Sequence, residues 1–382
     1  MKISRRSAVA PFLAMDIYAQ ARALEGHGRR ILHLEVGQPS SPAPKLALDA
    51  AAAAMGRDVL GYTEALGRQA LKRAIAEHYQ NHYGVSVAPD RVVITTGSSS
   101  GFILAFLALF DVGDTLAIPR PGYPAYRNTA SALGLRVASL PADVSAGFVA
   151  TPGMLDRNSQ VDGLLIASPG NPTGTVFSPD DLGRLAHTCR ERGIALISDE
   201  IYHGLAYEMS AQTALAFDDN AIVINSFSKY YSMTGWRIGW MVVPDAFVRT
   251  VERLAQNLFI CAPAISQVAA LAALSAQSEL DAHVARYRSN RDVLLRALAR
   301  AGLDLHAPAD GAFYLYVKTK VLGLPSQDLC KRLLHEAGIA ATPGADFDQE
   351  QGDDWIRLSY AGASADIEEA GERFCSWALK TG

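Results

Sequence analysis

The sequence predicts an α/β protein whose large domain has a mostly parallel sheet covered by helices on both faces, with a smaller α+β domain made from the two ends of the chain. Six short runs rich in Val, Ile and Leu lack the polar alternation of half-exposed strands, so they should be buried on both faces. Helix-like segments separate these runs, which is typical of a parallel sheet. The 382 residues, of which 49% are hydrophobic, are enough for a core of this size.

The elements of the large domain follow in regular order. The predicted strands are residues 91–95, 115–119, 163–168, 194–199, 221–225 and 238–243. The helices predicted between them are 101–110, 124–133 and 179–192. The third helix has the clearest start, because Ser178 is a suitable N-cap and Pro179 fits the first helical position.

After residue 275 the pattern changes. A long helical stretch is followed by a strand-like run at 312–317, a helix near 327–337 and a short strand at 355–359. We therefore expect a large domain at residues 44–275 and a small domain that combines residues 1–43 with 276–382.

Charge and cysteine content exclude several kinds of partner. The net charge is −4 and the basic residues are scattered, so neither nucleic acid nor a membrane is expected to bind. The four cysteines are far apart and form no C-x-x-C pair, which argues against disulfides and metal sites and favours the cytoplasm. Arg5 and Arg6 faintly resemble an export signal, but Pro11 interrupts the apolar run that follows. A small molecule is the expected ligand.

A lone lysine, Lys229, follows the apolar run 221–225, and Arg237 lies eight residues later. Burial beside another cation lowers the pKa of a lysine amine and so makes it a nucleophile. The hydroxyls of Ser226 and Ser228 and the planar fork of Arg237 suit phosphate oxygens. An imine-forming lysine beside a phosphate site indicates pyridoxal 5'-phosphate. Because a surface lysine after a buried strand would look similar, other segments must support this interpretation.

A second polar cluster, residues 96–101, follows the first strand and opens a helix. Open α/β sheets bind ligands at the carboxyl ends of their strands. The free backbone amides of this turn, with the hydroxyls of Ser98 and Ser99, form a natural phosphate site at the positive end of the helix. An ordinary capped turn is the alternative.

Two more clusters follow later strands. The turn 168–174 presents the Asn171 amide on a support that two prolines stiffen, where it can donate to a phenolate oxygen. Asp199 ends an apolar strand, and its buried carboxylate needs a cation such as a protonated pyridine nitrogen. That charge would keep the ring able to accept electrons. Tyr202 can reach the same ligand, although Asp199 also fits a helix N-cap.

Together the clusters resemble the class I and II aminotransferases, which are fold type I enzymes dependent on pyridoxal 5'-phosphate, and within them the aspartate and aromatic types. The matching motifs are S-P-G-N-P-T-G at 168–174, D-E-I-Y at 199–202 and S-F-S-K-x-x-x-M-T-G-W-R-I-G at 226–239. They occur in the family's order, and the resemblance covers residues 37–360.

The resemblance implies a role for each matching residue. Lys229 would form the internal aldimine, Asp199 would pair with the pyridine nitrogen, and Tyr202 would join them in the catalytic set. Arg357 would grip the α-carboxylate of the substrate, with Gly37 and Asn171 beside it. Further cofactor contacts are implied for Gly97, Ser98, Ser99, Tyr123, Asn171, Ser226, Ser228 and Arg237. The resemblance also implies a homodimer with shared active sites, in which Tyr62 of the neighbouring subunit contacts the cofactor.

The implied reaction moves an amino group from an L-amino acid to a 2-oxo acid by a ping-pong aldimine/ketimine mechanism, with Lys229 as general base and acid. β-Elimination C–S lyases share the same cofactor residues, so only the products separate the two activities. A related sensor domain of transcription regulators would carry a basic DNA-binding extension, for which the residues before Leu34 are too few.

A different enzyme class uses one of the same segments. Residues 97–101 match the G-x-S-x-G nucleophile elbow, which would make Ser99 the nucleophile of an α/β-hydrolase. The α/β-hydrolase hypothesis gives Lys229 and Arg237 no role, and the histidines after Ser99 lie in no triad motif.

The substrate side chain stays open. A dicarboxylic substrate would need a second arginine, for which Arg22, Arg127 and Arg286 are candidates. We expect residues 11–18 to lie near the entrance and to close over the substrate as a lid.

Overall fold

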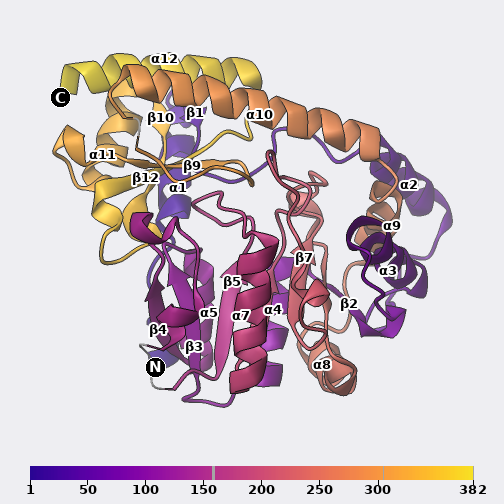
Figure 1. Ribbon diagram of the computed structural model, residues 1–382. Coiled ribbons are helices and arrows are strands. Elements are labelled where there is room, and N and C mark those ends of the chain that lie inside the picture. The colour runs from indigo at the N-terminus through magenta and orange to yellow at the C-terminus, as the bar shows by residue number, and fades with distance from the viewer. Residues whose placement is uncertain (157–159, 304, 382) are drawn as a thin grey trace.

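The structure, a computed structural model, describes residues 1–156, 160–303 and 305–381. Within them, the centre is a seven-stranded sheet (Figure 1). Its strands, in spatial order, are β2 (Val92–Thr95), β8 (Gly239–Val242), β7 (Ile222–Ser226), β6 (Ala195–Asp199), β5 (Gly163–Ala167), β3 (Thr115–Arg120) and β4 (Arg136–Pro141). Only β8 runs antiparallel to its neighbours, so the predicted mostly parallel sheet is confirmed.

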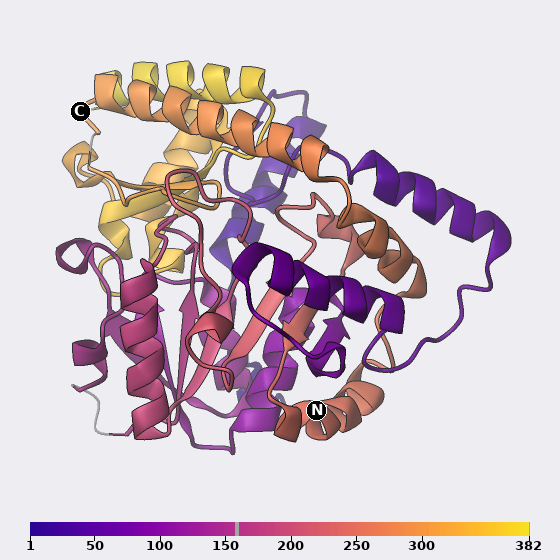
Figure 2. The ribbon, with the colours of Figure 1, turned by 45° about the vertical axis from the view of Figure 1, so that its right-hand side comes forward.

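Helices cover both faces of this sheet, where two separate apolar cores form (Figures 1 and 2). One face carries α3 (Gln69–Tyr83), α7 (Pro179–Arg192) and α9 (Ala264–Ala273), with α2 (Lys45–Arg57) against α9. The other carries α4 (Gly97–Leu109), α5 (Pro124–Leu133) and α8 (Asp245–Leu258). In β5, Leu164 and Ile166 enter the first core and Leu165 the second. Burial on both faces explains why this strand is a continuous apolar run.

The two ends of the chain share another core. There α10 (Gln277–Arg300) and α12 (Ser364–Thr381) lie side by side above an antiparallel sheet of β11 (Thr342–Pro343), β12 (Trp355–Ser359) and β9 (Tyr314–Lys318) (Figure 2). The N-terminal α1 (Leu13–Gly26) and β1 (Leu32–His33) join it, and β1 pairs in parallel with β10 (Ile339–Ala340). The mixed α+β character matches the prediction, while the domain boundaries stay a prediction.

Three local features differ from the sequence-based expectations. The edge strand β4 was not predicted, because its partly exposed residues do not form a continuous apolar run. Helix α4 begins at Gly97 rather than at residue 101, since Ser98, Ser99 and Ser100 form its first turn. The helix near 327–337 is α11 (Ser326–Arg332) followed by a π-helical turn.

Among the described helices, none is long and apolar enough to cross a bilayer. The short α6 (Pro152–Leu155) completes the helices.

Candidate active site

A cavity of about 260 Å³ lies at the carboxyl ends of the central strands, between the large sheet and the core formed by the chain ends. Residues from segments far apart in the sequence meet there. Of the residues predicted for the site, those that border the cavity are Gly37, Ser98, Ser99, Tyr123, Asn171, Asp199, Tyr202, Ser228, Lys229, Arg237 and Arg357.

Lys229 follows β7 and points into the cavity. Its Nζ donates a hydrogen bond of 2.6 Å to the carbonyl oxygen of Gly37, which lies in the N-terminal segment. Burial, and then the positive charges of Arg357 and Arg237, lower the pKa of the Lys229 amine to about 8. About one tenth of the amine is therefore neutral at pH 7, far more than for an unperturbed lysine, and this is the setting that the sequence predicted for a nucleophilic lysine.

Asp199 ends β6 with a buried carboxyl group. The backbone N–H of Ile201 donates to Oδ1 over 3.1 Å, and the hydroxyl of Tyr126 donates to Oδ2. Burial raises the pKa of Asp199 to about 6, and a cation beside it would lower that pKa again. Sequence reasoning missed Tyr126, which lies one helical turn after Tyr123 on α5; that spacing was the available signal.

The start of α4 lies next to Arg237 at the border of the cavity. No side chain caps this helix, so the first amides are free to bind an anion together with the hydroxyls of Ser98 and Ser99. Arg237 adopts a left-handed conformation (φ 51°) and packs against Gly97, where an added Cβ would lie 2.3 Å from Nη2. Only glycine leaves the guanidinium room there. Arg237 Nη1 donates to the backbone at Thr234, which fixes its direction.

Ser226 is buried next to Ser228, and its contact with the cofactor stays a prediction. Its Oγ donates over 3.1 Å to the carbonyl oxygen of Ile238 and lies 2.9 Å from Ser228 Oγ, while the Ser228 backbone N–H donates to it. Ser228 borders the cavity and Ser226 does not. Ser226 thus supports the position of Ser228.

Arg357 is buried on β12, and its guanidinium lies close to two aromatic rings. The Cζ lies 4.3 Å from the ring centroid of Tyr314 and 4.8 Å from that of Phe347. Its Nη atoms donate to Asn171 Oδ1, Thr342 Oγ1 and the carbonyl oxygen of Glu35. Its Nε–H is buried and has no hydrogen-bond partner among the described residues. A carboxylate in the cavity would satisfy that donor.

The entrance is covered by the start of α1. Phe12 and Met15 border the cavity, and the Phe12 ring meets the Tyr123 ring edge-on at 5.7 Å. The carboxylate of Asp346 accepts hydrogen bonds from the backbone N–H groups of Leu13 (3.3 Å) and Ala14 (3.2 Å), so it caps the helix from another part of the chain. This placement is compatible with the predicted lid, whose motion stays a prediction.

Several candidates lie away from the cavity. Arg22 pairs with a neighbouring glutamate, Arg127 donates to the backbone of Asp346, and Arg286 donates to a serine; none of the three borders the cavity. Tyr62 is 84% exposed on the surface of the single chain. Ser99 does border the cavity, but no histidine among the described residues does, so Ser99 has no imidazole base there.

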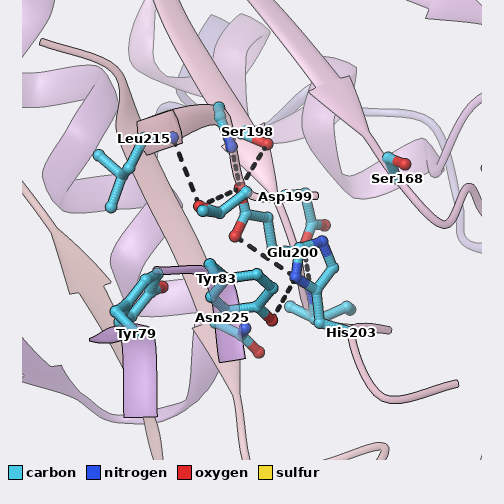
Figure 3. A network of polar contacts seen from close by, with 12 residues as sticks. Tyr79, Tyr83, Ser168, Ser198, Asp199, Glu200, His203, Leu215 and Asn225 are labelled. Atoms are coloured by element: carbon cyan, nitrogen blue, oxygen red, sulfur yellow. Dashed lines mark hydrogen bonds and ion pairs between the residues drawn. The ribbon is translucent and has the colours of Figure 1, made fainter. Parts of the chain in front are cut away.

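A second polar network lies just beyond Asp199 (Figure 3). Glu200 is fully buried, and its Oε1 accepts hydrogen bonds from Ser198, Thr213 and the backbone N–H of Ala214. Its Oε2 lies 3.6 Å from His203 Nδ1. The hydroxyl oxygen of Tyr83 lies 2.8 Å from the same Nδ1. Burial raises the pKa of Glu200 to about 8 and lowers that of His203 to about 3, so the pair is neutral near pH 7. The network anchors the segment that carries Asp199 and Tyr202.

Comparison with known proteins agrees with this geometry. The model of the family "aminotransferase class I and II" matches residues 29–374. The valine–pyruvate aminotransferase of Mycobacterium tuberculosis is 47% identical over 382 residues, covering 98% of both chains. The crystal structure of an aminotransferase from Mycobacterium tuberculosis superposes with a TM-score of 0.97 at 46% identity, covering 100% of each chain.

A more distant solved structure shares the same architecture. The aspartate aminotransferase of Thermus thermophilus with maleate gives a TM-score of 0.93 at 30% identity, covering 98% of this chain and 99% of the other. With a family match over most of its length and relatives that cover it almost completely, this chain belongs to the aminotransferase class I and II family.

Proposed function

We propose that this aminotransferase uses pyridoxal 5'-phosphate to move the amino group of a monocarboxylic L-amino acid with an apolar side chain to a 2-oxo acid, in a ping-pong reaction. The observation that carries the proposal is that one cavity is bordered both by Lys229, whose amine is partly neutral, and by Arg357, whose buried Nε–H has no partner among the described residues. When bound, the cofactor supplies an aldehyde carbon for a covalent link to the lysine and a ring that accepts electrons.

The residues present fit that cofactor. The free amides at the start of α4, with Arg237, would hold its phosphate. Asp199 would keep a proton on the ring nitrogen, since a cation there removes the cost of its buried charge. Tyr202 and the amide of Asn171, which both border the cavity, would donate to the ring oxygen, since Asn171 Oδ1 already accepts from Arg357 and leaves the amide nitrogen as the donor.

The chain's own residues then perform the proton transfer. Arg357 would bind the α-carboxylate with its free N–H, which orients the substrate. The Lys229 amine would take the α-proton at Nζ and return it to a neighbouring carbon, as its lowered pKa allows. The carbonyl oxygen of Gly37 would hold that amine in place between the two transfers.

The apolar part of the cavity lining favours an apolar substrate side chain. The cations that border the cavity are Lys229, Arg237 and Arg357, and each already has a role. The remaining wall includes Phe12, Met15, Val36, Phe102 and Ile103. A second carboxylate would lose its water there without gaining a cation from the described residues. The name of the valine–pyruvate relative points in the same direction, so valine and pyruvate are the pair to test first.

A homodimer with shared sites, in the cytoplasm, completes the proposal. Apolar side chains are exposed on adjacent segments of the surface, among them Met55 (65%), Val59 (95%), Tyr62 (84%) and Ile260 (51%). The segments touch where the Thr63 N–H meets Cys261 Sγ at 3.5 Å. An exposed patch of this kind is typical of an interface, and a second copy there would carry Tyr62 toward its partner's site. The cysteines are all free, which suits a reducing compartment.

The test combines spectroscopy with product analysis. Cofactor-loaded protein should show a visible band that borohydride abolishes, with the reduced label on Lys229. Lys229→Ala should lose the band and nearly all transfer, whereas Lys320→Ala, at an exposed lysine, should retain both. With valine and pyruvate, alanine and the valine-derived oxo acid should form without free ammonia. A loaded wild type lacking the band, or ammonia as the main product, would contradict the proposal.

A further inference from the structure

The buried Tyr314 contacts both Tyr202 and Arg357. No sequence motif pointed to this residue. Tyr314 is the first residue of β9, is 2% exposed and borders the cavity. Its hydroxyl oxygen lies 2.8 Å from that of Tyr202, and its ring lies 4.3 Å from the Arg357 guanidinium. Gly37 leaves room for it, because a Cβ at that position would lie 1.6 Å from the Tyr314 hydroxyl.

The direction of the hydroxyl contact follows from the number of hydrogens. Burial raises the pKa of Tyr314 and of Tyr202, so each phenol keeps its one hydrogen at neutral pH. When Tyr202 donates to a ligand oxygen in the cavity, its hydrogen is used and its lone pairs are free. The hydrogen between the two phenols must then come from Tyr314. Such a chain polarises Tyr202 and makes it a stronger donor.

The ring of Tyr314 acts on a different partner. The Arg357 Cζ lies over this ring, 4.3 Å from its centroid, and it also lies 4.8 Å from the centroid of Phe347. The contact with the Tyr314 ring, together with the hydrogen bonds of the Nη atoms, limits the directions that the planar guanidinium can take. The hydroxyl and the ring therefore serve two distinct groups.

We propose that Tyr314 is a positioning residue for the transfer reaction: its hydroxyl orients and polarises Tyr202, and its ring fixes Arg357 for the substrate carboxylate. The proposal rests on the proposed function. It predicts that the two effects separate when the hydroxyl and the ring are removed in turn.

The hydroxyl is tested by the pH titration of the visible band. Weaker donation to the cofactor's ring oxygen leaves that oxygen more basic, so it holds the neighbouring imine proton more tightly. Tyr314→Phe should therefore raise the midpoint of the titration by about 0.5 pH unit, with KM for the amino acid changed less than about twofold. In a Tyr202→Phe background the same change should add nothing, because Tyr314 acts through Tyr202. Tyr316→Phe, equally buried on the same strand but outside the cavity, is the matched control.

The ring is tested by KM. Tyr314→Leu removes the stacking and should raise KM for the amino acid roughly tenfold beyond Tyr314→Phe. A wild-type midpoint in Tyr314→Phe, or an additive shift in the double variant, would overturn the role of the hydroxyl. An unchanged KM in Tyr314→Leu would overturn the role of the ring, and if that variant does not fold, Tyr314→Phe still decides the first role. A wild type without the band would instead count against the proposed function.

Discussion

Glu200→Gln is the substitution whose effect on stability the structure defines most closely. The buried Glu200 Oε1 accepts three hydrogen bonds, from Ser198, Thr213 and the backbone at Ala214, and a glutamine oxygen can accept the same three. Burial is the largest cause of the rise in the pKa of Glu200 from 4.5 to about 8. The variant therefore keeps the contacts and removes the ionisation.

The sign and size of the effect follow from proton linkage. Between pH 4.5 and 8 the folded protein binds the Glu200 proton and the unfolded chain does not, so this carboxyl group makes stability fall as pH rises through that window. Each pH unit corresponds to about 1.4 kcal/mol. From pH 6 to pH 8 the wild type should lose about 2 kcal/mol of unfolding free energy that Glu200→Gln retains, because the folded carboxyl group is half ionised by pH 8.

Urea denaturation of both proteins at pH 6, 7, 8 and 9 measures this difference. The wild type must be compared with the variant at each pH, because a second group also changes the unfolding free energy in this range. The hydrogen bond to Glu35 is the main cause that raises the pKa of His33 to about 9, so the contribution of His33 to stability is lost between pH 6.5 and 9. That loss cancels, since both proteins contain His33. Glu191→Gln, at an exposed carboxyl group, should run parallel to the wild type. Parallel curves for Glu200→Gln as well would refute the reasoning, because they would mean that Glu200 is already ionised in the folded protein.

Three further predictions concern the cavity. Arg357→Lys replaces a fork with a point charge and should raise KM for the amino acid roughly 10- to 100-fold while the visible band persists; an unchanged KM would contradict carboxylate binding there. Asp346→Ala removes the cap of α1 and should raise KM by roughly fivefold and increase amide exchange at Leu13, with unaltered exchange as the contrary result. Gly37→Ala forces an overlap with Tyr314 and should destabilise the protein by about 1–3 kcal/mol in thermal unfolding and lower kcat; wild-type values would show that the cavity adapts.

The sequence predicted those parts of the site that depend on short stretches of chain. Lys229, Asp199 and Asn171 each follow a buried strand, and the continuous apolar runs of those strands are visible without any structure. The ends of parallel strands meet at one edge of a sheet, so the residues after them were expected to converge.

Contacts between distant segments could not be predicted in this way. Tyr126 reaches Asp199 across 73 positions, and Tyr314 reaches Tyr202 across 112. No local pattern encodes either pairing, because each depends on how α5 or β9 packs against the central sheet. The same is true of the capping of α1 by Asp346, which joins residues more than 300 positions apart.

Three of the long-range contacts in the site share a property that bears on how substrate binding and proton transfer would be linked. Each joins a residue within 44–275 to one outside it: Lys229 to Gly37, Asn171 to Arg357, and Tyr202 to Tyr314. Movement of the chain ends relative to the large sheet would therefore change all three contacts together. A carboxylate that moves Arg357 would also change the contact between Arg357 and Asn171. Through β9, it would change the contact between Tyr314 and Tyr202 as well. Under the proposed function, substrate binding at Arg357 would thus be linked to the positions of Lys229 and Tyr202.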